Sequence, residues 1–407
     1  QSTGGSMKKV ALLALTLICL SLWQPVTAIA GVSATIRAEV ERIHSGECVS
    51  VGDCPIASTI VLPALYEKYD YQPIWKNPDA VSQLVAAIEA SHLDGLDPDD
   101  YHLADIRRMQ AKLAAGSDQA TQASLDVVLT DSLIRLGYHL VIGKVDPESL
   151  DGNWNMERTL ELDPILEMSR AIGSGKVDNL IDSFRPQAAI YHKLKAALAR
   201  YRELEAAGGW PAVPDGETLK PGMQDPRVVA LRRRLAVTGD LPAGNVESPE
   251  FDEQLEAGVT HFQQRHGLEA DGIVGKGTLA ELNVPVDARI DQLRVNLERA
   301  RWVLHDLPQE FVITDIAGFR VMYFRGGEPL WETRAQVGKS YRKTPVFRDR
   351  IRYVEFNPTW TVPPTILKKD ILPKVKKDHG YLGKKNIRVI DKSGNTVDAG
   401  SIDWSKY

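Results

Sequence analysis

Apolar residues recur at spacings of three and four over residues 56–201, which is the period of amphipathic helices. Turn-forming clusters interrupt the pattern at Asp94-Gly95, Asp146-Pro147 and Asp151-Gly152. The sequence therefore predicts a helical domain over residues 31–207. Two of its apolar faces are clear: Leu84, Val85 and Ile88 form one, and Leu125, Val128, Leu129, Leu133 and Leu136 form the other.

A second helical unit follows a Gly- and Pro-rich linker and spans residues 216–285. Its first two helices are marked by Val228, Leu231 and Leu235, and by Leu255, Val259 and Phe262. Gly267 has the position of a residue that ends a helix, Asp271-Gly272 that of a tight turn, and Thr278 opens a short third helix. The spacing predicts a small three-helix domain.

The periodicity changes along residues 286–407. An amphipathic helix runs from Val286 to Leu304, and β-branched and aromatic residues then predict strands. A Gly326-Gly327 turn between two of them indicates a hairpin. The expected strands are Phe311–Ile316, Arg320–Arg325, Leu330–Val337, Ile351–Phe356, Ile387–Ile390 and Thr396–Val397, with a short basic helix over residues 368–377.

Charge is uneven along the chain. The whole chain has a formal net charge of −5, but residues 339–407 carry 16 Lys and Arg against 7 Asp and Glu, a local charge of +9. This excess fits attraction to an anionic polymer, although a solvated basic surface explains it as well and is the favoured interpretation. The overall negative charge argues against a nucleic-acid-binding protein.

The N-terminus has the pattern of a secretion signal. Residues 1–6 resemble an expression scar before Met7, and residues 7–30 contain Lys8 and Lys9, an apolar run and the small residues of Ala28-Ile29-Ala30. An uncleaved anchor is disfavoured because the run, Val10 to Trp23, is shorter than the roughly 20 residues that span a bilayer. A lipoprotein at Cys19 is disfavoured by bulky Ile18. We expect an exported chain cleaved after Ala30, with no membrane anchor and a net charge of −7 once Lys8 and Lys9 are removed from −5.

Cys48 and Cys54 remain after this cleavage, spaced C-x5-C. In an exported protein this spacing predicts a disulfide, and a catalytic thiol would need a partner base, for which only His44 is nearby in sequence. Four histidines within residues 56–201, His92, His102, His139 and His192, lack metal-ligand spacing, so we expect packing or surface roles, with no metal site and no cofactor.

The unit over residues 216–285 resembles the peptidoglycan-binding module of many wall-directed hydrolases and transferases. The resemblance is carried by Leu219-x-x-Gly222, Val228-x-x-Leu231, Val259-x-x-Phe262-Gln263 and Gly267-Leu268-x-x-Asp271-Gly272-x-x-Gly275-x-x-Thr278. For Asp271, Gly272 and Gly275 individually, building the turn is the favoured role. Such a module indicates peptidoglycan as the partner without defining a reaction.

A wider set of motifs resembles the larger Gram-negative L,D-transpeptidases over residues 56–407. These motifs are Tyr71-x-Pro73-x-Trp75, Gly95-Leu96-Asp97-Pro98 with Tyr101, Val337-Gly338-Lys339, Thr344-Pro345, Asn357-Pro358-x-Trp360-x-Val362-Pro363 and Leu372-Pro373. The resemblance implies a multidomain protein: an all-α scaffold domain, a small three-helix peptidoglycan-binding module and, within residues 286–407, a linker helix and an incomplete mainly-β catalytic domain with a capping segment.

The resemblance also implies a chemistry and a compartment. In this family a cysteine thiolate paired with a histidine forms an acyl-enzyme with a peptidoglycan stem peptide, makes 3→3 cross-links in the periplasm and is the target of carbapenems. This sequence has no cysteine after Cys54, and His379 is the one histidine after His305. No catalytic residue can therefore be assigned; the nucleophile and its base are expected beyond Tyr407, and the chain itself is expected to be inactive.

Two residues are candidates for substrate contact, Trp360 and Asn357 of the Asn-Pro-x-Trp motif, although core packing is an equally good expectation for Trp360. A non-catalytic peptidoglycan-binding scaffold is the alternative function, and the codons after Tyr407 would separate it from the enzyme. A zinc hydrolase is disfavoured because clustered ligands are missing from the sequence.

Overall fold

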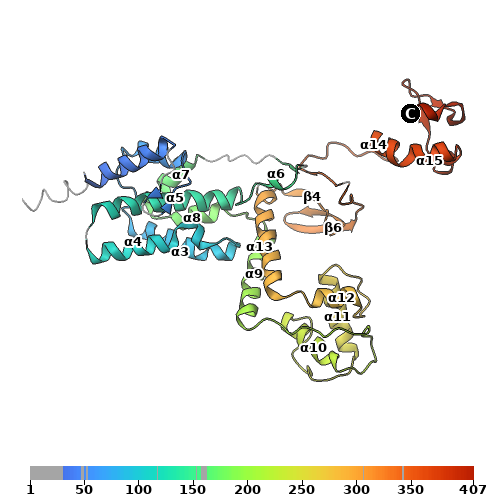
Figure 1. The fold of residues 1–407 in the computed structure, drawn as a ribbon, viewed down its shortest axis with the longest axis horizontal. Coiled ribbons are helices and arrows are strands. Elements are labelled where there is room, and N and C mark those ends of the chain that lie inside the picture. The colour runs from blue at the N-terminus through green and yellow to red at the C-terminus, as the bar shows by residue number, and fades with distance from the viewer. Residues whose placement is uncertain are drawn as a thin grey trace, which may run out of the picture. The chain divides into compact units, whose positions relative to one another are not determined.

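A computed structural model describes residues 31–46, 50–51, 54–116, 118–152, 154–156, 163–305, 307–341 and 343–407 (Figure 1). The expected signal peptide, residues 7–30, and Cys48 lie outside these ranges. The chain divides into two compact units, Gln1–Phe347 and Arg348–Tyr407. Within the described ranges, none of the helices has the length and apolarity needed to cross a bilayer.

The first unit begins with the predicted helical domain, which is confirmed. Residues 31–44 are helical, and a short hairpin of β1 (Ser50–Val51) and β2 (Cys54–Pro55) precedes the helix array. The array contains α2 (Val61–Lys68), α3 (Pro78–Ala90), α4 (Leu103–Ala115), α5 (Gln119–Val141), α6 (Pro147–Leu150), α7 (Pro164–Ser174) and α8 (Val177–Ser183), with 3-10 turns η1 (Ser91–Asp94) and η2 (Pro98–Tyr101).

Helix α5 is the centre of this domain, because apolar side chains on several of its faces are buried. Its buried Asp126 accepts hydrogen bonds from the Tyr66 hydroxyl at 2.7 Å and from the backbone N–H of Trp75 at 3.1 Å. The Trp75 indole donates to Thr130 Oγ1 at 2.9 Å. The motif that contains Trp75 is therefore anchored to the core helix by buried polar groups that satisfy one another.

The predicted three-helix unit is confirmed as α10 (Arg227–Thr238), α11 (Glu253–Arg265) and α12 (Lys276–Leu282). All the apolar residues expected to face its core are buried. Gly267 has φ +66°, so it ends α11 in the left-handed conformation that glycine adopts most easily. The third helix begins two residues before the expected Thr278.

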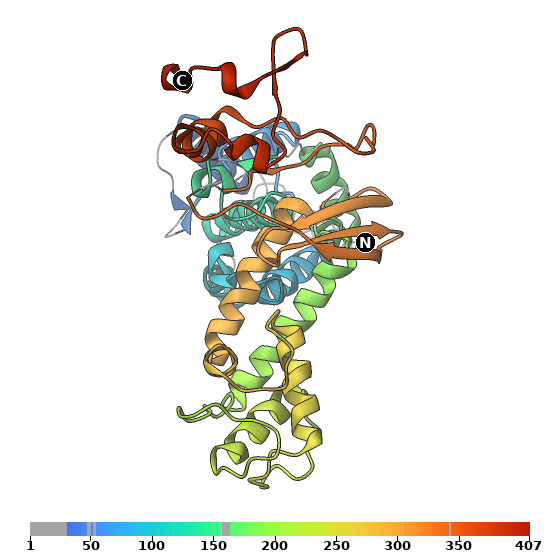
Figure 2. The same cartoon turned by 90° about the vertical axis from the view of Figure 1, so that its right-hand side faces the viewer.

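Helices α9 (Ala189–Ala206) and α13 (Val286–Val303) pack against each other on either side of this unit in sequence. Figures 1 and 2 show the two helices side by side, with the α10–α12 unit at one end of the pair. Their shared core includes Leu198 and Leu297, both fully buried. The α10–α12 unit is thus an insertion between two paired helices, which the apolar pattern of α13 alone did not predict.

A three-stranded antiparallel sheet of β4 (Glu310–Asp315), β5 (Arg320–Arg325) and β6 (Glu328–Arg334) follows α13. The predicted Gly326-Gly327 turn is confirmed, with φ values of +60° and +84°. The short strands β3 (Trp154–Asn155) and β7 (Val346–Phe347) pair in parallel. The strand predicted at Ile351–Phe356 was wrong: this segment has no regular structure and its large side chains are exposed. β-branched and aromatic residues favour a strand only where a partner strand supplies hydrogen bonds.

The second unit holds α14 (Pro364–Ile366), a π-helical turn η3 (Leu367–Ile371), α15 (Leu372–Lys377) and α16 (Tyr381–Lys384). The hairpin of β8 (Val389–Ile390) and β9 (Thr396–Val397) and the turns η4 (Ala399–Ser401) and η5 (Trp404–Lys406) complete it. The predicted basic helix and the last two strands are confirmed, with β8 shorter than expected. A small core forms around Val375, Leu382 and Trp404.

Candidate functional site

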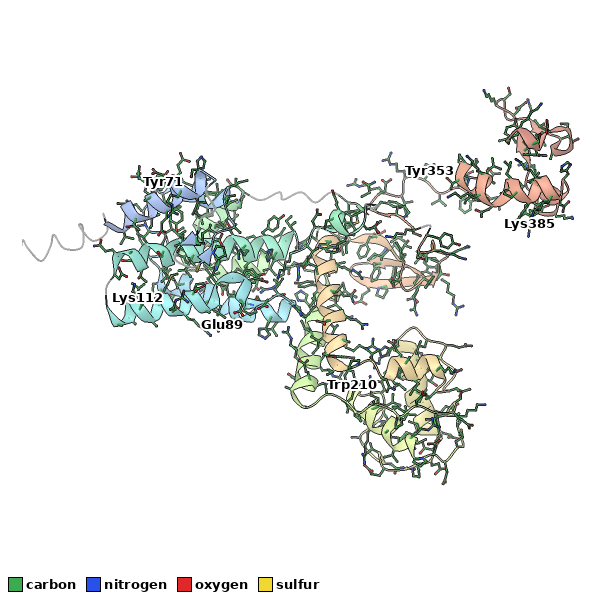
Figure 3. All side chains as sticks on the ribbon, viewed as in Figure 1. Tyr71, Glu89, Lys112, Trp210, Tyr353 and Lys385 are labelled. Atoms are coloured by element: carbon green, nitrogen blue, oxygen red, sulfur yellow. The ribbon has the colours of Figure 1, made fainter. Side chains whose placement is uncertain are left out.

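The Asn-Pro-x-Trp segment lies in irregular chain of the second unit, just before α14. The Trp360 side chain is 65% exposed, so it does not pack in the core of this unit. Asn357 is also exposed and has φ +55°, a conformation that asparagine tolerates better than most residues. Tyr353, which precedes this segment and is labelled in Figure 3, is 82% exposed. The two candidate residues are therefore accessible to a ligand, and Asn357 has a backbone role of its own.

The basic helix after this segment presents its lysines to solvent. Lys376 Nζ donates to the Tyr407 carbonyl oxygen at 2.8 Å, and Lys384 forms an ion pair with Asp378 at the same distance. The hydrogen bond from Lys384, followed by that from the Gly380 backbone N–H, holds the pKa of the Asp378 carboxyl below its usual value. Part of the positive charge of this unit is thus paired within the protein.

In the α10–α12 unit, Gln263 organises the turn between α11 and α12. Its side-chain Nε2 donates to Asp271 Oδ1 and to the Ile273 carbonyl, both at 2.9 Å, and its Oε1 accepts from the Gly272 N–H at 2.9 Å. A Cβ on Gly272 would lie 2.8 Å from Glu256 Cγ. These contacts support the structural role expected for Asp271 and Gly272.

The structure places a thiol beside an imidazole in the helical domain, far along the chain from residues 309–407. Cys54 of β2, His102 and Asp105 each bring one potential ligand atom within 4.8 Å of the others. No local motif indicates this cluster, because Cys54 lies about 50 residues before the other two. The expectation that His102 has a packing or surface role missed this grouping.

Hydrogen bonds already satisfy these groups. His102 Nε2 lies 3.0 Å from Asp131 Oδ2. Burial raises the pKa of the Asp131 carboxyl, but the His102 hydrogen bond and the charge of Arg135 outweigh it, so the pKa lies below its usual value. Partial burial likewise raises the pKa of Asp105, but the hydrogen bond from the Cys54 thiol and the charge of Arg108 bring it below its usual value. Thiol, imidazole and carboxylate can ligate Zn²⁺, and a carboxylate behind the histidine is a usual companion of such sites.

Burial limits what this cluster can do in catalysis. Cys54 is fully buried and His102 is 6% exposed, so a polymeric substrate has no access to the sulfur. A reactive thiol needs solvent access and an electropositive setting. The cluster is therefore a structural element of the helical domain.

His92, His139 and His192 of this domain likewise have packing or surface positions. The Tyr101 hydroxyl lies 2.9 Å from His139 Nδ1, and burial lowers the pKa of His139 to about 4. His92 and His192 are exposed. His379, the one histidine of residues 309–407, is exposed in the second unit.

Comparison with protein families assigns all three parts of the chain. A scaffold domain matches residues 61–198, a "putative peptidoglycan binding domain" matches residues 224–282, and the L,D-transpeptidase catalytic domain matches residues 309–407. The third match includes the sheet β4–β6 and the Asn-Pro-x-Trp segment. The chain thus has the domain composition of an L,D-transpeptidase: a helical scaffold domain, a three-helix domain that matches the peptidoglycan-binding family, and a strand-containing part that matches the catalytic domain.

Two curated proteins are similar to parts of the chain. A "Putative L,D-transpeptidase" of Haemophilus influenzae is 35% identical over 113 residues, which are 28% of this chain and 23% of that protein. The "N-acetylmuramoyl-L-alanine amidase CwlM" of Mycobacterium tuberculosis is 39% identical over 80 residues, which are 18% of this chain and 20% of that protein. The matches thus span about a quarter or less of either relative.

Proposed function

We propose that this protein serves peptidoglycan L,D-transpeptidation in the periplasm of a Gram-negative cell, forming 3→3 cross-links. In this reaction a cysteine thiolate attacks the carbonyl carbon of the third stem-peptide residue and expels the terminal D-alanine; an amine of a second stem then takes the acyl group and releases the thiolate. The observation that carries the proposal is the succession of scaffold, peptidoglycan-binding and L,D-transpeptidase domains in one chain.

The exposed side chain of Trp360 in the second unit supports a contact with the substrate. An exposed indole offers apolar area and one N–H donor to a peptide. Trp360 has this exposure, whereas Trp404 of the same unit is buried and donates through Nε1 to the Ala399 carbonyl at 2.9 Å. We assign Trp360 and Asn357 to contact with the stem peptide, and Trp404 to the core.

The nucleophile is not among residues 309–407, which contain no cysteine. The thiols of the exported chain are Cys48 and Cys54, and the second is buried in the helical domain. We therefore propose that residues 31–407 bind peptidoglycan and do not form an acyl-enzyme. The Cys48–Cys54 disulfide and the cleaved signal peptide are parts of the same proposal for an exported protein.

A non-catalytic peptidoglycan-binding scaffold is the second candidate function. The observation that favours it is the same absence of cysteine from residues 309–407 of the sequence. The two candidates differ in what they require of Trp360: a contact with the stem peptide is needed for transpeptidation and is not needed for a scaffold that binds through α10–α12.

The test is a titration of the ¹⁵N-labelled chain, residues 31–407, with a soluble tetrapeptide stem. The indole N–H signal of Trp360 is identified by its loss in Trp360→Phe, and the signal of Trp404 is the internal control. We expect the Trp360 signal to shift in a saturable manner while the Trp404 signal stays in place. A stationary Trp360 signal, in a chain that still sediments with isolated sacculi, would favour the scaffold over the enzyme.

A further inference from the structure

The first unit contains a cavity of about 550 Å³ between the peptidoglycan-binding domain and the helix pair α9–α13. Ligand pockets in proteins are usually about 300–1,000 Å³, so this cavity has the size of a small-molecule or short-peptide site. Its walls come from α9, from the ends of α10 and α11, and from α13. Neither the inserted domain nor the helix pair forms it alone.

The polar wall of this cavity carries more positive than negative charge. Arg265 makes a bidentate ion pair with Asp240, with N–O distances of 2.7 and 2.6 Å, and Arg289 pairs with Glu281 at 2.6 Å. Burial, followed by the charges of Arg289 and Arg265, lowers the pKa of His266 to about 4, so its imidazole is neutral near pH 7. Two of the three arginines of the lining are thus neutralised within the protein.

Arg200 of α9 is the third arginine and is exposed at the cavity. Its Nη2 donates to the Thr238 carbonyl at 3.0 Å, and none of the carboxylates in the described part of the chain forms an ion pair with it. A guanidinium has five N–H donors in a planar fork that matches a carboxylate. Arg200 therefore supplies a positive charge that an anionic ligand can neutralise.

The rest of the lining suits a short peptide. Tyr201, Leu204 and Leu293 offer apolar and aromatic surface, while Gln292 and Asn296 of α13 offer amide groups. The small side chains of Ala196 and Ala197 leave room on the α9 wall. Apolar surface with a few placed polar groups is the usual composition of a ligand site.

We propose that this cavity binds a peptidoglycan stem peptide, with the C-terminal carboxylate of the peptide paired to Arg200. The proposal depends on the proposed function for its ligand class and adds a second stem-peptide contact, distant in sequence from Trp360. Because the walls come from both the inserted domain and the α9–α13 pair, a bound peptide would hold the two together.

Trp210 provides a reporter for the cavity. Its indole N–H donates to the Val284 carbonyl at 3.1 Å, and its ring lies edge-on to Tyr201, with centroids 5.8 Å apart. Figure 3 labels Trp210 between α9 and the inserted domain. A ligand that contacts Tyr201 should therefore move the indole N–H signal of Trp210, which Trp210→Phe identifies.

The experiment titrates the ¹⁵N-labelled chain, residues 31–407, with the tetrapeptide stem and with the same peptide carrying a C-terminal amide. We expect the free acid to shift the Trp210 signal and to bind roughly tenfold more tightly than the amide, because a charge-assisted hydrogen-bond pair is lost with the amide. Arg200→Gln should weaken binding at Trp210 by a similar factor. Arg299→Gln, on an exposed position of α13 outside the cavity, is the matched control and should leave binding unchanged.

Ala197→Leu tests the same site without a change of charge, since the larger side chain fills the cavity from α9. Thermal unfolding of each variant confirms that the fold is retained. An Arg200→Gln chain that binds as tightly as the original, or a stationary Trp210 signal while Trp360 responds, would overturn the cavity site and leave the proposed function in place. Loss of the response at both tryptophans, together with loss of sacculus binding, would overturn both.

Discussion

Arg301 Nη1 donates to the backbone carbonyl of Asp94 at 2.8 Å, although 207 residues separate them in sequence. Arg301 is buried and also forms an ion pair with Glu298 at 2.5 Å. The Asp94 carboxylate forms ion pairs with Arg185 and Lys195 and accepts a hydrogen bond from the Tyr191 hydroxyl. This buried network ties α13, the helix before the L,D-transpeptidase region, to the scaffold domain.

Arg301→Leu should therefore destabilise the chain by about 3 kcal/mol, because it leaves buried partners of a charge network unpaired. Arg299→Leu, on the exposed side of the same helix, should change stability by less than about 0.5 kcal/mol. Urea unfolding of the two variants measures the difference. Equal stabilities would mean that α13 is not held by this network.

The turn of the peptidoglycan-binding domain depends on one buried amide. Gln263→Leu removes the hydrogen bonds of Gln263 to Asp271, Gly272 and Ile273, and should destabilise this domain by about 2–3 kcal/mol. Gln264→Leu, an exposed neighbour, is the control. Hydrogen exchange of the α11 and α12 amides reports on the domain separately from the scaffold. Unchanged protection in Gln263→Leu would contradict the role given to this side chain.

These elements also show how far the sequence alone leads. The helix faces of α10 and α11 and the hairpin at Gly326-Gly327 were predictable, because local periodicity and turn chemistry determine them. The pairing of α9 with α13 was not, since an apolar face shows that a helix is covered without showing by what. Ile351–Phe356 was predicted as a strand from propensity, and in the structure it has no partner strand.

The candidate sites, too, were only partly predictable from the sequence. Trp360 was found from its motif, but its exposure could not be read from the residue type. The grouping of Cys54, His102 and Asp105, and the position of Arg200 at a cavity, arise from contacts between segments far apart in the chain. No local spacing in the sequence carries such information.

Two half-buried histidines should make stability depend on pH in a defined window. Burial, the largest cause, lowers the pKa of His139 and of His266 from 6.5 to about 4, so between these values the unfolded chain binds more protons than the folded chain. Stability is fully present above about pH 6.5 and falls as the pH drops towards 4. Between pH 7 and pH 5 the loss should be about 2 kcal/mol for His139 and about 1 kcal/mol for His266, which solvent screens more.

Thermal unfolding at these two pH values measures the effect. His139→Gln and His266→Gln should each make the dependence shallower. Asp118, whose pKa is lowered to about 2 by Lys112 and Thr121, responds at lower pH and does not contribute in this window. A double variant with the same pH dependence as the original chain would contradict the argument.

Cys48 and Cys54 are predicted to form a disulfide when the chain is exported. The mass of the non-reduced protein should then lie about 2 Da below that of the reduced protein, and neither cysteine should react with iodoacetamide before reduction. Oxidation would also remove the thiol hydrogen bond to Asp105, so the pKa of Asp105 should rise. Alkylation of both cysteines in exported, non-reduced protein would rule the disulfide out.

Intact-protein mass spectrometry after exposure to a carbapenem tests the central claim most directly. The claim is that this chain, which matches the L,D-transpeptidase catalytic domain over residues 309–407, forms no acyl-enzyme within residues 31–407. Residues 309–407 contain no cysteine, Cys54 is buried beside His102 and Asp105, and Cys48 is proposed to be paired with Cys54. The account predicts an unchanged mass, with Trp360 still responding to the stem peptide. A stable covalent adduct on Cys48 or Cys54 would contradict it and place the nucleophile in the scaffold domain.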